Sequence, residues 1–252
     1  EITAAVFSLP NFYTQEVEIF IKRDSVPVKV PLDKLLLSQS FKDTSQIRPE
    51  IIAEAKKALD IAMKLIEPTF LMDKFTIRKV DRDTILVQQT ELQVGESSHL
   101  LNQATEAVVY LSTIGNKLEI TVNKLSMEGD FELAYWLDCA GVLALNEIDN
   151  EVWAHVENLA AREGYGVGLS LSPGSLKGWD IKEQKQLCAL LDPGTIGVTI
   201  NDASLLVPHK SASSIIGIGP DYPSNKVSSA CDYCISDGKC WMRKAREGAR
   251  HV

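Results

Sequence analysis

Three of the five cysteines lie close together near the end of the chain, as Cys231, Cys234 and Cys240, with the spacing C-x2-C-x5-C. Soft thiolates bind iron–sulfur clusters or zinc, and a C-x2-C step lets two sulfurs reach one centre from a tight turn. Gly238 lies in the second gap and lets the chain fold back toward the third thiol. The spacing predicts a thiolate metal centre. An iron–sulfur cluster is favoured over zinc, and unligated thiols are the third alternative.

The motif does not supply a fourth ligand, for which the candidates are Cys139, Cys188, His251 or an exogenous group. The first two fall among apolar residues of predicted helices, where a buried free cysteine is usual. An odd number of cysteines and a start, "EITAAVFSLPNF", without a signal peptide favour a reducing compartment. We therefore expect a cytoplasmic protein whose clustered thiols are ligands rather than disulfides.

The composition limits the classes of partner. The chain has 252 residues, of which 45% are hydrophobic, and a net charge of −8. Such a charge argues against a general nucleic-acid binder. No apolar run approaches the ~20 residues that a membrane span needs. We expect neither nucleic acid nor a membrane as a partner.

Two polar turns are the other candidate sites. The first is Pro173-Gly174, flanked by Ser172 and Ser175, and the second is His209-Lys210-Ser211 in "PHKSAS". Each is also typical of a plain connection between strands. After the first turn come Lys177 and Trp179, and the indole either covers a flat ligand or anchors the core.

No Ser/His/Asp arrangement or pair of carboxylates indicates a catalytic centre, and whether the chain is an enzyme stays open. Asp138 and Glu157, on the predicted long helix, are interpreted as solvated or capping charges.

Hydrophobic periodicity and turn residues place these motifs on elements. Residues 1–44 are rich in strand and loop signals, and proline interrupts them. Gly164 is the expected C-cap of the long helix. The pattern predicts helices over 45–68, 96–115, 131–162 (one helix or two) and 180–194, and strands over 74–80, 83–94, 164–174, 196–208 and 213–219.

Residues 100–219 resemble the activation (reactivation) domain of cobalamin-dependent methionine synthase, and more closely the free-standing activation-domain-like proteins of anaerobic bacteria. The resemblance implies an α+β fold, a curved and mostly antiparallel sheet packed by long helices. It implies one activation-domain-like domain over 1–219, of which 1–44 are not clearly matched. Residues 220–252 have little apolar periodicity and are expected to form a cysteine-bearing appendage. The matching stretches are "LLNQATEAVVYLSTIGNKLE", "AYWLDCAGVLALNEIDNEVWAHVENLA", "LSPGSLKGWDIKEQKQLCALLD" and "IGVTINDASLLVPHKSASSIIGIG".

The resemblance also implies that both polar turns lie at one cleft. In the family, an Arg-x-x-Pro-Gly-Tyr segment helps to bind S-adenosylmethionine. Here Ser170 stands at the arginine position and Ser175 at the tyrosine position. A serine hydroxyl does not replace the two charge-assisted hydrogen bonds of a guanidinium. We therefore expect weak or absent binding of S-adenosylmethionine. The residues implied to bind a cofactor are Ser172, Pro173, Gly174, Ser175, His209, Lys210 and Ser211.

The implied function is that of a corrinoid-protein activation factor. Its partner is a methionine synthase or a related cobalamin-dependent methyltransferase, and the cysteine centre is the expected entry point for electrons. The alternative is a non-catalytic scaffold subunit of a corrinoid methyltransferase complex, with structural zinc on the cysteines.

Overall fold

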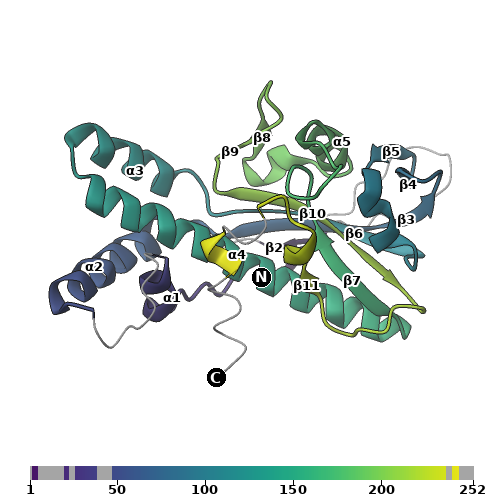
Figure 1. Ribbon diagram of the computed structural model, residues 1–252, viewed down its shortest axis with the longest axis horizontal. Coiled ribbons are helices and arrows are strands. Elements are labelled where there is room, and N and C mark those ends of the chain that lie inside the picture. The colour runs from purple at the N-terminus through teal and green to yellow at the C-terminus, as the bar shows by residue number, and fades with distance from the viewer. Residues whose placement is uncertain (1, 5–19, 23–25, 39–46, 237–239, 244–252) are drawn as a thin grey trace.

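The computed structural model describes residues 2–4, 20–22, 26–38, 47–236 and 240–243, and its ribbon is shown in Figure 1. A nine-stranded sheet carries the fold, in the order β1-β2-β3-β6-β10-β7-β11, with β4 beside β3 and β5 beside β4. All its pairings are antiparallel except that of β11 with β7. The strands are β1 (Ile2–Ala4), β2 (Phe20–Lys22), β3 (Thr69–Lys79), β4 (Thr84–Val87), β5 (Thr90–Gln93), β6 (Glu106–Thr113), β7 (Gly166–Leu171), β10 (Ser211–Gly219) and β11 (Ser228–Ser229).

A single long helix, α4 (Phe131–Glu163, 33 residues), runs along one face of this sheet (Figure 1). The Asp130 side chain caps its start by accepting a hydrogen bond from the backbone N–H of Leu133 at 3.2 Å. Gly164 ends it in the left-handed region with φ of 72°, as predicted. The sequence left one helix or two open, and the structure has one. None of the helices in the described part of the chain has the length and apolar character for a bilayer span.

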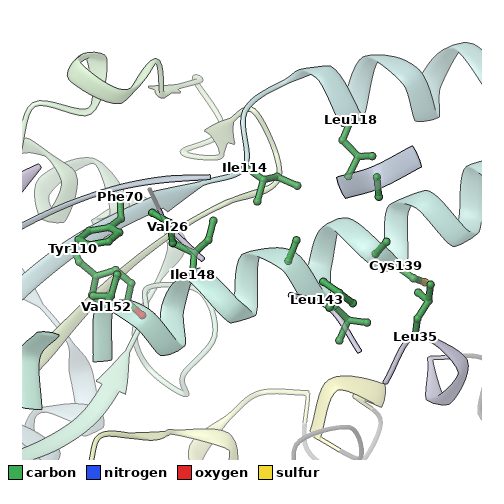
Figure 2. Close-up of a cluster of buried hydrophobic side chains, with 14 of the residues drawn as sticks. Val26, Leu35, Phe70, Tyr110, Ile114, Leu118, Cys139, Leu143, Ile148 and Val152 are labelled. Carbon is green, nitrogen blue, oxygen red and sulfur yellow. The ribbon is translucent and has the colours of Figure 1, made fainter. Parts of the chain in front are cut away.

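Beyond the sheet, α4 packs with α1 (Leu32–Leu37), α2 (Pro49–Leu65) and α3 (Lys117–Glu128) (Figure 1). Figure 2 shows the resulting core, in which Phe70 and Tyr110 of the sheet meet Ile148 and Val152 of α4. The predicted helix over 45–68 is confirmed with Pro49 in its first turn.

The opposite face of the sheet has a second core. It is covered by the short helix α5 (Gln184–Ala189), the hairpin of β8 (Thr199–Ile200) and β9 (Leu206–Val207), and 3₁₀ turns. Side chains alternate between the two faces, so Tyr110 lies in the α4 core and the next residue, Leu111, lies in the second core.

The predicted helix over 96–115 is wrong. The structure has a 3₁₀ turn, η2 (Gly95–Leu101), followed by β6. All residues of β6 after Glu106 are buried, so its apolar run is continuous and does not alternate. Periodicity cannot distinguish such a doubly covered strand from a buried helix. Helix α3 was not predicted, and residues 26–31, read as strand-like, form no strand.

The start of the predicted appendage is joined to the sheet. The strand β11 pairs in parallel with β7, through Ser228 beside Leu169 and Ser229 beside Ser170. The hydroxyl of Tyr222 donates to the carbonyl of Leu100 at 3.0 Å. A Cβ on Gly217 would lie 2.4 Å from that hydroxyl, so the ring needs a glycine there.

Candidate functional site

A pocket of about 390 Å³ lies where β7 ends and β10 begins. The antiparallel register places Leu171 opposite Ile215, so the residues after β7 adjoin those at the start of β10. The pocket is lined by Ser172, Pro173, Gly174, Ser175, Ile181, Gln184, Leu205, Leu206, His209, Ser211, Ala212 and Ser213.

Most of the residues expected at a cleft meet at this pocket. From the first turn these are Ser172, Pro173, Gly174 and Ser175, and from the second His209 and Ser211. Lys210 does not line it, because its Nζ pairs with the Asp138 carboxylate of α4 at 2.6 Å. The structure thus brings together two turns that lie far apart in the sequence.

The serine hydroxyls of the lining are hydrogen-bonded to neighbouring groups. Ser172 Oγ lies 2.6 Å from Ser214 Oγ, and Ser175 Oγ donates to the carbonyl of Ser172 at 2.8 Å. Ser213 Oγ donates to Gln184 Oε1 at 3.2 Å. The described lining contains no Lys, Arg, Asp or Glu. Such a pocket suits a neutral polar ligand and offers no ionic partner to an amino-acid zwitterion.

His209 is held from α3. Its backbone N–H donates to Glu119 Oε2 at 2.9 Å, and its Nδ1 lies against Glu119 Oε1 at 2.5 Å. Burial alone would raise the pKa of Glu119, but the hydrogen bonds from His209 and the charges of His209 and Lys210 outweigh it and lower the pKa. With Nδ1 facing a carboxylate, the neutral ring carries its proton there and leaves Nε2 as an acceptor.

Ser170, at the family's arginine position, does not reach the pocket. Its Oγ lies 3.0 Å from the hydroxyl of Tyr110, to which the indole N–H of Trp153 donates at 3.2 Å. Burial raises the pKa of Tyr110, so the phenol stays protonated. This network is under α4, on the face of the sheet opposite α5.

Trp179 is a core anchor. It is 1% exposed and packs in the core around α5, so it offers no face to a ligand. Lys177, the other residue predicted near the first turn, does not line the pocket. Glu157 accepts from the backbone N–H of Val227 at 2.9 Å and pairs with Lys226 at 2.6 Å, which attaches the tail to α4.

The sequence interpretation missed Gln184. Its side chain is buried, and its amide nitrogen donates to the carbonyl of Ser204 at 2.7 Å. A signal was available, because Gln184 precedes Leu187 and Cys188 at helical spacing and so lies on the apolar face of its helix.

The cysteines do not assemble into a metal site. Within the described ranges, no three Cys, His, Asp or Glu side chains lie close enough to hold a metal ion. Cys231, Cys234 and Cys240 are partly exposed, and none of these described cysteines forms a disulfide. Cys139 and Cys188 are buried, and burial raises the pKa of Cys188 to about 11. His251 lies outside the described residues, and the residues present do not fit the iron–sulfur cluster or zinc predicted from the spacing.

Comparison with known proteins supports the fold. No protein-family model matches the chain, and no curated protein matches it significantly. Among solved structures, the crystal structure of the MetH reactivation domain bound to AdoHcy matches with a TM-score of 0.53 and 14% identity, over 84% of this chain and 82% of that one. The chain shares the fold of that domain, and the predicted α+β fold class is confirmed. The resemblance to free-standing proteins of anaerobic bacteria stays a prediction.

Proposed function

We propose that this chain is a corrinoid-protein activation factor. It docks on a cobalamin-dependent methyltransferase, a methionine synthase or a related enzyme, and assists the return of inactive Co(II) to Co(I). One observation carries the proposal: the two turns that the resemblance assigns to a cleft do line one pocket, in a fold shared with a reactivation domain.

The chemistry of the pocket is compatible with a corrinoid. A corrin ring is a flat apolar surface with neutral amide side chains, and the lining offers hydroxyls, one amide and one imidazole. The β8–β9 hairpin next to the pocket has two exposed apolar side chains. Leu205, in its loop, is 42% exposed, and Val207, in β9, is 38% exposed. Exposed apolar side chains beside a neutral polar pocket suit a partner that covers the opening.

The side chains of the pocket lining also argue against the use of S-adenosylmethionine by this chain. The similar structure holds AdoHcy, whose amino-acid end is a zwitterion. Here the described part of the pocket lining has no Lys, Arg, Asp or Glu to pair with that end, and Ser170 is hydrogen-bonded to Tyr110 in the core. We propose that this chain contributes docking and a binding surface, and that a separate donor supplies the one electron.

The test fills the pocket. Ala212 lines it, so Ala212→Phe should block the approach of the corrinoid, whereas Ala154→Phe, on the exposed surface of α4, serves as the control. Reduction of cob(II)alamin in a purified corrinoid methyltransferase is followed by its visible spectrum. We expect tenfold or greater loss for the first variant and none for the second. Equal activation by both variants would exclude the pocket as the contact.

The scaffold alternative has less support. It rests on structural zinc at the three cysteines, which do not form a ligand group in the described part of the chain.

A further inference from the structure

The two cysteines of the C-x2-C step lie at the ends of one tight turn. Residues Cys231–Tyr233 form a 3₁₀ turn, η5, and the backbone N–H of Cys234 donates to the carbonyl of Cys231 at 3.3 Å. A hydrogen bond of this kind holds the two Cα atoms within about 7 Å. Disulfides span Cα separations of roughly 4.4–6.8 Å, so a small adjustment of the turn suffices to join the sulfurs.

Both sulfurs accept hydrogen bonds. Ser229 Oγ donates to Cys231 Sγ at 3.2 Å, and the backbone N–H of Ser236 donates to Cys234 Sγ at 3.4 Å. These contacts hold both sulfurs in place at the turn, and thiol–disulfide exchange proceeds by attack of a thiolate sulfur. Both thiols are also partly exposed, unlike the buried Cys139 and Cys188.

We propose that Cys231 and Cys234 form a reversible dithiol/disulfide pair that exchanges with low-molecular-weight disulfides. The first thiolate attacks one sulfur of a small disulfide, RS–SR, and releases RS⁻, which takes up a proton. The second thiolate then attacks the protein sulfur of this mixed disulfide and releases the other RS⁻. The protein loses two electrons and two protons, and the small disulfide becomes two thiols.

This pair is attached to the wall of the pocket. The backbone N–H of Ile235, the residue after Cys234, donates to the carbonyl of Ser175 at 2.9 Å. Cys234 itself forms an antiparallel bridge with Leu176, which is buried. Closing the disulfide alters the turn that precedes these contacts. The oxidation state of the pair therefore acts on the pocket at Ser175, which lines it.

The test measures thiols on the full chain, with no corrinoid present. The protein is equilibrated in buffers of varied glutathione to glutathione disulfide ratio, alkylated and analysed by peptide mass. We expect Cys231 and Cys234 to be protected together and joined to each other, with Cys139 and Cys188 still reduced. Cys240→Ser should keep this disulfide, and Cys234→Ser should give only a mixed disulfide with glutathione.

Three results would overturn the proposal: both thiols alkylated at every ratio, a disulfide that uses Cys240 instead, or a purified chain whose bound metal protects all three cysteines. Amide hydrogen exchange of residues 172–176, compared between the oxidised and reduced chain, tests the link to the pocket. Equal exchange would overturn that link. None of these readouts depends on activation of a partner, so the proposed function can fail without affecting them.

Discussion

The His209-Lys210-Ser211 turn of the pocket is held by two carboxylates from different helices. His209 is bound by Glu119 of α3, and Lys210 by Asp138 of α4 at 2.6 Å. The two side chains go to different places, since His209 is at the pocket and Lys210 reaches α4. One therefore lines the pocket, and the other fastens the turn to the helical layer.

Glu119→Gln should loosen this turn in a pH-dependent way. The pKa of Glu119 is lowered in the folded chain, so its stabilisation is present above the unfolded pKa of a glutamate and is lost as pH falls through the folded value. We expect the wild type to have a higher Tm than the variant near neutral pH, and the difference to shrink in acid. Thermal unfolding followed by circular dichroism measures both.

The matched control is Glu128→Gln at the end of α3. That carboxylate pairs with Lys124 at 3.8 Å and is 56% exposed, so it should change Tm little at any pH. A Glu119 variant that matches this control at neutral pH would mean that the contact between Glu119 and His209 does not stabilise the fold.

S-adenosylmethionine should bind weakly or not at all. Loss of a buried bidentate contact to a carboxylate commonly costs ~2–5 kcal/mol, or ~30-fold or more in affinity. The described part of the pocket lining contains no Lys or Arg that could replace the lost contact to the carboxylate. Isothermal titration calorimetry with the full chain is the measurement. Micromolar affinity would contradict this expectation and would require that another residue binds the carboxylate.

At the level of elements, the segment after β10 is part of the sheet layer. Tyr222 packs over Gly168 and Gly217 of the neighbouring strands, where a Cβ would come within 3.0 and 2.4 Å of its ring or hydroxyl. Burial raises the pKa of Tyr222 to about 12. The two glycines therefore leave space for this ring, which then fastens the following segment to β7 and β10.

Tyr222→Ala should destabilise the protein by about 2–4 kcal/mol, because it leaves a cavity over these glycines and removes the hydrogen bond to Leu100. Tyr233→Ala is the matched control, since this ring is 42% exposed. Urea unfolding gives both values, and equal midpoints would show that Tyr222 does not hold the segment. A chain truncated after Pro220 loses Tyr222 and β11 together.

In the whole molecule, the pocket and the cysteine turn are connected through the sheet. The first turn of the pocket follows β7, β11 pairs with β7, and the cysteine turn follows β11 and returns to Ser175. A change at the cysteine turn therefore has a short backbone route to the pocket. The long helix α4 covers the other face of the sheet and presents no residue to the pocket lining described here.

Features that depend on local chemistry were predictable from the sequence. The helix from Phe131 to Glu163 has a helical apolar stripe and a glycine at its end, and both signals are local. The Pro173-Gly174 turn is equally local. The resemblance added the fold class and the expectation that this turn and the His209 turn share one cleft.

Features that depend on which strands pair were not predictable. The buried run of β6 looked helical because both of its faces are covered, and only its neighbours β3 and β10 make it a strand. Ser170 and Leu171 point to opposite faces because the register of β7 against β10 sets the direction of each side chain. The same register places the two turns at one end of the paired strands, and the packing of α5 on β10 brings Gln184 to Ser213. Spacing alone likewise could not show that the three cysteines are not gathered at one centre, because that depends on how the tail packs against Ser175 and Leu176.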